Sequence, residues 1–255
     1  MKEIAVLFSG GIDSTYISAN FAKEYDIIHL LTYTSPHHVF KWKCLINLKK
    51  LKKRYGERKF RHEIIDVGST FKVLSGGYRK IIKDCIKTGY SHIGCISCRI
   101  AACIEVIKYC RKYNILQVAD GYNPAQFFDV VEKRFQADLI PLFYERHGIK
   151  RSAPLQDYYK VTRKLPQNEK YSNKIKNIFY PKVSRDPQIS EFERLGFYKG
   201  VKIKDLDLLN QQSCLLAIVS HVMGPAMKIK YRDVFEYIGK KMKLGDRLLT
   251  EKSTA

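Results

Sequence analysis

The stretch IAVLFSGGIDSTYISANFAK, residues 4–23, joins an apolar run to a helix-like segment through two adjacent glycines. Residues 4–8 form a continuous apolar run of strand length, which is typical of a strand buried on both faces of a parallel sheet. Residues 14–23 favour a helix. The stretch therefore predicts a buried strand followed directly by a helix, which is the unit that α/β folds repeat.

The turn between the two elements has the features of an anion site. Gly10 and Gly11 can adopt backbone angles closed to other residues and let another group approach the backbone closely. Asp13 or Ser14 is the expected N-cap of a helix whose first turn presents unpaired N–H groups and a partial positive charge. The turn therefore predicts a phosphate site, and a capped turn without a ligand is the alternative.

The spacing of the turn excludes two familiar nucleotide motifs, since it is neither G-x-G-x-x-G nor G-x-x-x-x-G-K-[ST]. Residues 9–14 read S-G-G-x-D-S instead. This sequence resembles the PP-motif of the N-type ATP pyrophosphatase (PP-loop) superfamily, whose members cleave ATP to AMP and pyrophosphate while adenylating a carbonyl oxygen. The resemblance implies ATP and Mg²⁺ as cofactors, with Asp13 as a catalytic residue that places the metal or orients the loop. It implies that the phosphates are held by Ser9, Gly10, Gly11, Asp13, Ser14 and Thr15.

Strands and helices alternate along the first half of the chain. Strands are expected at residues 27–34, 62–68 and 115–121, with a fifth at 137–142, and helices at 39–55, at 71–87 with a break at Gly76-Gly77, and at 99–113. This alternation predicts an α/β fold with an open, doubly wound, mostly parallel sheet. The resemblance implies its adenine nucleotide alpha hydrolase-like, Rossmann-like form.

The regular alternation ends near residue 150. We expect residues 1–150 to form a PP-loop ATP pyrophosphatase domain, and residues 151–255 to form a smaller, mainly helical and basic C-terminal extension packed on it. Helical periodicity returns at residues 204–222 and 231–242.

Ligands of such sheets gather at the carboxyl ends of the strands. The S-G-G-x-D-S turn follows one strand, and Asp120-Gly121 follows another. The two turns are expected to face one cleft, which makes Asp120 and Gly121 candidate nucleotide-binding residues.

The charge of the chain predicts a polyanionic partner. Its 255 residues include 46 Lys and Arg against 25 Asp and Glu, a formal net charge of +21. Residues 41–61 carry ten basic residues and a single acid, and residues 160–185 interleave basic residues with aromatic ones. Because basic residues neutralise phosphates and aromatic side chains stack on unpaired bases, RNA is the expected partner. Solvated lysine-rich helix faces are the alternative.

The sequence shows neither an apolar stretch long enough to span a bilayer nor the layout of a signal peptide. These features predict a cytoplasmic protein without membrane association. Seven cysteines in such a protein favour thiols, metal ligands or redox chemistry over a disulfide framework.

Cys95 and Cys98 form a C-x-x-C pair at the opening of the helix expected before the fourth strand. Such a pair supplies two ligands to a tetrahedral metal or a cluster, or forms a redox pair, and the helix dipole favours thiolates. Cys103 and Cys110 are expected in the core. The histidines show no metal spacing, so His37, His38 and His92 are expected to be loop residues. The further ligand candidates are Cys44, Cys85, Cys103, Cys110 and Cys214.

The order and spacing of CISCR, residues 95–99, and VADGYN, residues 118–123, are similar to those of tRNA-thiolating PP-loop enzymes with a C-x-x-C motif. The resemblance implies that Cys95, Cys98 and Cys214 are catalytic and hold a [4Fe–4S] cluster, or that Cys95 or Cys98 works with Cys214 through a persulfide and a disulfide. Zn²⁺ is the alternative metal for the cysteines. Many relatives carry Thr and His where this chain has ADGYN, which indicates a different substrate.

The leading hypothesis is an ATP-dependent sulfurtransferase that adenylates and thiolates a nucleobase in tRNA. Its partners would be tRNA, bound through the basic surface, and a sulfur donor protein; the sequence carries no indication of the oligomeric state. Arg99 is a candidate for stabilising anionic intermediates. One alternative is a PP-loop synthase acting on a small molecule, similar to 7-cyano-7-deazaguanine synthases or to enzymes that insert sulfur into cofactors. Another is a nucleotide- or RNA-binding protein without turnover.

Overall fold

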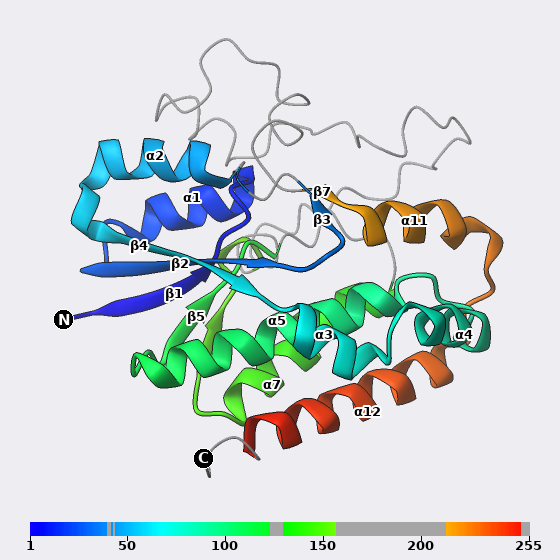
Figure 1. Ribbon diagram of the computed structural model, residues 1–255. Helices are drawn as coiled ribbons and strands as arrows, with labels where there is room; N and C mark the ends of the chain where they lie inside the picture. The colour runs from blue at the N-terminus through cyan, green and yellow to red at the C-terminus, as the bar shows by residue number, and fades with distance from the viewer. Residues whose placement is uncertain (40–41, 43, 123–129, 157–212, 251–255) are drawn as a thin grey trace.

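The computed structural model describes residues 1–39, 42, 44–122, 130–156 and 213–250 (Figure 1). The basic segment at residues 160–185 and the first part of the helix expected at 204–222 lie outside these ranges. No helix of the described ranges combines the length and the apolar character needed to cross a bilayer.

A parallel sheet of five strands forms the centre of the molecule, as the alternating pattern predicts. Its order is β4-β2-β1-β5-β6, so the chain moves outward from β1 in one direction and later returns to the other side of it. In such sheets ligands bind outside the carboxyl ends of the strands, at the point where the order reverses. That point lies here between β1 and β5. The strands are β1 (Glu3–Leu7), β2 (Ile27–Thr34), β4 (Phe60–Asp66), β5 (Gln117–Ala119) and β6 (Lys150–Ser152).

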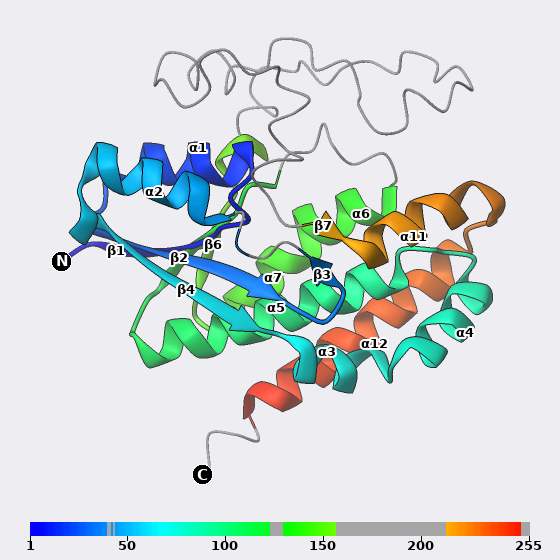
Figure 2. The same ribbon diagram turned by 45° about the horizontal axis from the view of Figure 1, so that its top comes forward.

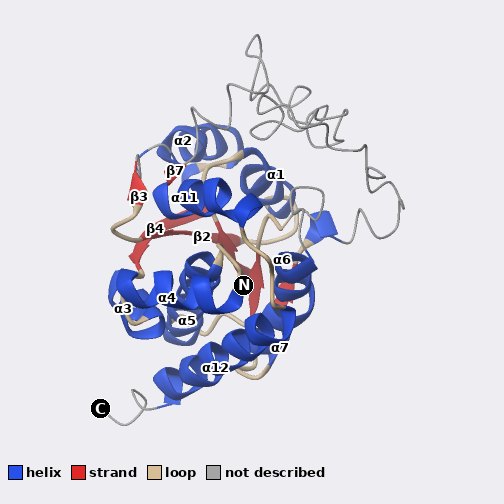
Figure 3. Cartoon of the chain, turned by 90° about the vertical axis from the view of Figure 1, so that its right-hand side faces the viewer, coloured by secondary structure: helices blue, strands red, loops and turns tan. Residues whose placement is uncertain are grey.

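Helices cover both faces of the sheet, which gives three layers (Figures 1 and 3). One face carries α1 (Ile12–Phe21) and α2 (Cys44–Tyr55). The opposite face carries α3 (Gly68–Ser75), α4 (Tyr78–Thr88), α5 (Ile93–Lys112) and α7 (Ile140–Glu145). The C-terminal helix α12 (Tyr231–Thr250) packs on the outer side of these helices (Figure 1). The shorter elements are β3 (His38–Val39), η2 (Glu57–Lys59), α6 (Val130–Arg134), η4 (Phe135–Leu139), β7 (Ser213–Cys214), α11 (Leu215–Met223) and η6 (Gly224–Ala226).

The side chains of β1 explain why its sequence is apolar throughout. Ile4 and Val6 belong to the core under α1 and α2, whereas Ala5 and Leu7 belong to the core on the α5 side. Alternate residues of a strand point to opposite faces, so a strand covered on both sides needs apolar residues at every position.

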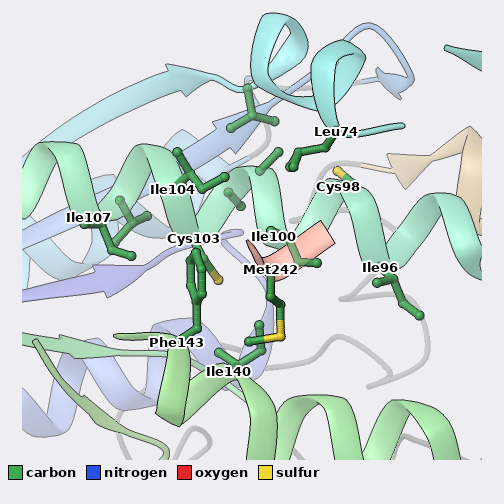
Figure 4. Close-up of a cluster of buried hydrophobic side chains, with 14 of the residues drawn as sticks. Leu74, Ile96, Cys98, Ile100, Cys103, Ile104, Ile107, Ile140, Phe143 and Met242 are labelled. Atoms are coloured by element: carbon green, nitrogen blue, oxygen red, sulfur yellow. The ribbon is translucent and has the colours of Figure 1, made fainter. Parts of the chain in front are cut away.

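The larger core surrounds α5, whose apolar residues are buried along most of its length (Figure 4). Cys103 and Cys110 are fully buried there, as predicted. Figure 4 shows Cys103 beside Phe143 and Met242, which come from α7 and α12. The C-terminal helix α12 is therefore part of the same core as the sheet, and β6 crosses the boundary expected at residue 150.

One predicted element is wrong, and one predicted helix break is confirmed. The strand expected at 137–142 is wrong, because residues 135–139 form a π-helix that continues into α7, and the fifth strand is β6. The apolar residues Phe135, Ile140, Phe143 and Tyr144 are all buried, a spacing that fits one face of a helix. The break expected at Gly76-Gly77 is confirmed, since both glycines have positive φ (73° and 87°) and separate α3 from α4.

Candidate functional site

The S-G-G-x-D-S turn lies between β1 and α1, at the carboxyl edge of the sheet beside the reversal point. Gly10 has a φ of 79°, in the region that favours glycine. The Ser9 hydroxyl accepts a hydrogen bond from the Gly11 N–H (3.2 Å), and the hydroxyls of Ser14 and Thr15 donate to the Gly11 carbonyl (3.2 and 2.7 Å). The hydroxyls therefore fix the shape of the turn.

The helix begins two residues earlier than a cap at Asp13 would allow, and three earlier than a cap at Ser14. Gly11 is the N-cap of α1, with no side-chain hydrogen bond to it, and Asp13 lies inside the first turn. The expectation that Asp13 or Ser14 is the N-cap is therefore wrong. Because a glycine cap has no side chain to accept hydrogen bonds from the helix, the start of α1 can offer its N–H groups to an anion.

Asn47 of α2 supports the turn, and this role of Asn47 was not predicted from the sequence. Its amide nitrogen donates a 2.7 Å hydrogen bond to the Gly10 carbonyl, and its side chain is fully buried. The sequence signal is a polar residue on the apolar side of α2, between the buried Cys44 and Leu48.

We expect Asn47→Ala to weaken ATP binding roughly fivefold without unfolding the chain, because a lost neutral hydrogen bond costs about 1 kcal/mol. Isothermal titration with ATP measures the effect, and Asn20→Ala, near the other end of α1, is the matched control. Wild-type affinity in Asn47→Ala would show that the turn does not depend on α2.

The turn after β5 lies against the S-G-G-x-D-S turn. A Cβ atom added at Gly121 would meet the Asp13 Cβ at 3.0 Å and the Ser14 nitrogen at 3.1 Å. Only glycine allows this close approach without displacement of the α1 start. The two turns therefore meet, as the strand order predicts.

Asp120 forms a buried ion-pair cluster with two arginines. Its carboxylate accepts hydrogen bonds from Arg99 Nη2 (2.5 Å), from Arg151 Nη2 (2.8 Å) and Nε (2.9 Å), and from the Tyr122 N–H (3.1 Å). Burial alone would raise the pKa of Asp120, but Arg151 and Arg99 outweigh it and hold the pKa below its ordinary value. The observed contacts show that Asp120 positions the guanidinium groups of Arg99 and Arg151. A direct contact between Asp120 and a nucleotide stays a prediction.

The three cysteines of the predicted sulfur site come from two elements at the same edge of the sheet. Cys95 and Cys98 lie in the first two turns of α5, and Cys214 ends β7 and caps α11. Figure 2 shows β7 and α11 above the start of α5. A Cβ atom added at Gly94 would meet Leu216 Cδ2 at 2.9 Å, so α11 packs tightly on this start.

Burial sets the acidity of these thiols. It raises the pKa of Cys98 to about 12 and raises that of Cys95 even further, and repulsion from Cys214 adds to both shifts. The pKa of Cys214 is also raised by burial. The expected thiolate character at the helix start is therefore wrong for the metal-free protein, because desolvation outweighs the helix dipole. A bound cation would favour the thiolates.

Two histidines lie beside the cysteines. His37 is in the turn after β2, as expected, whereas His38 lies in the short strand β3. His38 pairs with Cys214 in the short β3–β7 ladder, and the Leu215 N–H donates to the His37 carbonyl (3.0 Å). Both imidazoles are buried. His37 Nε2 lies 3.4 Å from Cys98 Sγ. The sequence signal is their place in S-P-H-H, directly after β2 at the carboxyl edge of the sheet.

The donor set of this region fits a thiophilic metal. It offers three thiols and two imidazoles, which zinc and iron–sulfur centres both accept. Cys95 Sγ lies 3.9 Å from Ser220 Oγ and is partly exposed.

The helix α2, which contacts the S-G-G-x-D-S turn through Asn47, has a basic outer face. The outer side of α2 exposes Lys49, Lys53 and Arg54, while Asn47 of the same helix holds the turn. The first basic segment therefore runs along α2, from beside the turn to the opposite edge of the sheet, where β4 begins.

The chain was compared with known proteins. No family model and no curated protein matches it. Among solved structures it is similar to a predicted tRNA methyltransferase subunit from Methanocaldococcus jannaschii, with 21% identity, coverage of 64% of this chain and 74% of that one, and a TM-score of 0.42. It is also similar to the U34-tRNA thiolase NcsA from Methanococcus maripaludis, solved with its [4Fe–4S] cluster (12% identity, 96% and 72% coverage, TM-score 0.42). A third is the NMN synthetase from Francisella tularensis (11% identity, 98% and 87% coverage, TM-score 0.33).

Proposed function

We propose that the protein is an ATP-dependent sulfurtransferase that forms AMP and pyrophosphate while it adenylates and thiolates a nucleobase in tRNA. One observation carries the proposal: a chain of contacts joins the nucleotide turn to the thiols. Asp13 lies against Gly121, the residue after Asp120. Asp120 pairs with Arg99, and Arg99 directly follows Cys98.

The nucleotide turn activates the acceptor. The N–H groups at the start of α1 and the glycine backbone hold the triphosphate, and Asp13 places the Mg²⁺ that neutralises the departing pyrophosphate. The oxygen of the base attacks the α-phosphorus, and the bond to pyrophosphate breaks. A base oxygen that leaves poorly becomes part of AMP, a good leaving group.

The cysteine site delivers the sulfur. Cys95, Cys98 and Cys214 can hold a [4Fe–4S] cluster or zinc, which would bind or activate sulfur. The outer sulfur of a persulfide on Cys95 or Cys98, loaded by a donor protein, forms a bond to the activated carbon while the carbon–oxygen bond to AMP breaks. A second thiol then attacks the cysteine sulfur of this adduct, so the S–S bond breaks and the sulfur stays on the base. The disulfide formed in this step is reduced by an external dithiol. Arg99 is held by Asp120 near this point and can neutralise the phosphate of the adenylate.

The basic face of α2 supports tRNA as the acceptor. Lys49, Lys53 and Arg54 are exposed on the outer side of α2, and Lys49 lies two residues from Asn47, which holds the turn. Phosphate contacts of this kind weaken steeply as salt rises. Charge reversal at these three positions should therefore lower tRNA affinity and flatten its salt dependence.

The decisive experiment measures pyrophosphate and AMP from ATP with and without tRNA, and analyses the tRNA nucleosides by mass spectrometry. We expect tRNA to stimulate pyrophosphate release and a thiolated nucleoside to form when a sulfur donor is present. Release of orthophosphate would contradict the proposal. A rate of pyrophosphate release that is the same with and without tRNA would point to a small-molecule acceptor.

Cys95→Ala should abolish thiolation, lowering product at least about 100-fold, while tRNA-stimulated pyrophosphate release continues, because the adenylation step does not use this thiol. Cys110→Ala is the matched control, since Cys110 is a buried cysteine of the same helix that lies in the core away from the site. Thiolation at the wild-type level in Cys95→Ala would remove Cys95 from the sulfur step.

A further inference from the structure

The compact part of the sulfur site is a mixed group of two histidines and one cysteine. One ligand atom each from His37, His38 and Cys214 lies within 4.8 Å of the other two. Zinc binds nitrogen at about 2.0 Å and sulfur at about 2.3 Å, so a tetrahedral ion separates its ligand atoms by roughly 3.3–3.8 Å. Small side-chain rotations would bring the three residues to this spacing around a single ion.

Cys98 lies next to this group, although its Sγ is not within 4.8 Å of all three ligand atoms. Its Sγ lies 3.4 Å from His37 Nε2, and its side chain is buried. The fully buried Ser35 hydroxyl forms hydrogen bonds of 2.8 Å with His37 Nε2 and 3.2 Å with His38 Nδ1. Both imidazoles therefore face the Ser35 hydroxyl, and Cys98 lies beside His37. The Ser35 N–H also donates to His38 Nδ1 (3.1 Å), which leaves the Nε2 of His38 as its nitrogen for a metal.

His37 also carries an unsatisfied buried nitrogen, which is Nδ1 and not the Nε2 that faces Cys98. Its side chain is only 5% exposed, and its Nδ1 atom is buried with no hydrogen-bond partner in the described part of the chain. An unsatisfied buried polar atom of this kind costs about 1–3 kcal/mol. Native structures rarely keep such an atom unless a bound group or a functional state uses the side chain.

We propose that Cys98, Cys214, His37 and His38 form a Cys₂His₂ site for one zinc-class ion, which ties β3 and β7 to the start of α5. The proposal deepens the function proposed above in one respect, since it leaves Cys95 as the thiol available to carry sulfur. The ligand set itself does not depend on that function. Two thiolates and two neutral imidazoles in tetrahedral arrangement are a common zinc set.

The test uses the full-length protein purified without added metal. Metal analysis should find about one zinc per chain, and X-ray absorption at the zinc edge should fit two sulfur and two nitrogen neighbours. This measurement needs no variant and is therefore independent of any effect of substitution on folding.

The variants His37→Ala and His38→Ala should each lower zinc affinity at least about 100-fold, because the loss of outer-shell partners alone costs up to that much. With Co²⁺ in place of zinc, both variants should keep the sulfur-to-metal charge-transfer band but change the tetrahedral d–d bands. His147→Ala is the matched control, because His147 bonds Asp246 and Arg111, away from the site.

Sulfur-only coordination, or zinc content unchanged in both histidine variants, would overturn the histidine ligands. Iron with acid-labile sulfide in the wild type would overturn the single-ion site. A zinc site of the expected composition in a protein that releases no pyrophosphate would leave this proposal standing and contradict the proposed function, so the two failures are distinguishable.

Discussion

Asp13→Ala is expected to lower ATP-dependent pyrophosphate release about 10²–10³-fold, the range measured when one preorganised group is removed from an active site. Asp13 lies in the first turn of α1, half-buried and against Gly121. Mg²⁺ is usually held by one or two carboxylates together with substrate phosphates, and Asp13 is the carboxylate of the nucleotide turn. Its loss should leave the pyrophosphate leaving group without a positioned counter-ion.

Asp13→Ala should still fold, because an acidic side chain at a helix start contributes only about 0.3–1 kcal/mol to the free energy of unfolding. Asp26→Ala is the matched control: this exposed carboxylate accepts a 2.7 Å hydrogen bond from the Lys2 N–H at the opposite end of the sheet. It should retain the wild-type rate. In Asp13→Asn, the remaining activity should require a higher Mg²⁺ concentration. A wild-type rate in Asp13→Ala would exclude the metal-placing role.

The S-G-G-x-D-S turn could be predicted because all the residues that define it are adjacent in the sequence. Residues 9–14 contain the glycines, the hydroxyls and the carboxylate, and the apolar run before them fixes the strand that presents them. The order β4-β2-β1-β5-β6 follows the expected alternation, and it brings Gly121 against Asp13. The strand that was wrongly expected at 137–142 is also instructive, because a short apolar run has no unique period and fits a helix equally well.

The site residues that were not predicted contact residues that lie far away in the sequence. Asn47 reaches Gly10 from 37 residues away, and Arg151 reaches Asp120 from 31. His38 meets Cys214 through a ladder of two residue pairs, too short to leave a sequence pattern. Contacts of this kind depend on how the elements pack, which spacing alone does not encode.

The prediction of thiolate character at Cys95 and Cys98 is wrong for a related reason. A cysteine at a helix start is expected to ionise easily, and this rule uses only the local dipole. The desolvation that reverses it at Cys98 depends on what packs over α5. Here α11 packs there, and it begins at Leu215, more than one hundred residues along the chain.

Asp120→Asn is expected to lower the free energy of unfolding by about 3–5 kcal/mol, because removing one partner of a buried ion pair leaves a buried charge uncompensated. Asp120 is buried, and the Arg151 side chain is only 2% exposed. Arg99→Met should cost less, since Asp120 keeps its two bonds from Arg151. Urea denaturation measures both variants. Glu236→Gln, which breaks the exposed pair with Lys240, is the control and should leave stability unchanged within error.

The same carboxylate should make stability depend on acid pH. The folded protein holds the pKa of Asp120 below its ordinary value, so the unfolded chain binds the proton more readily. The contribution of Asp120 is therefore complete above its unfolded pKa of about 3.9 and is lost as pH falls through the folded pKa. The difference in unfolding free energy between wild type and Asp120→Asn should be constant near neutral pH and shrink below about pH 4. A difference that stayed constant through this range, or a loss under about 1 kcal/mol at neutral pH, would mean that the two arginines are held by other groups.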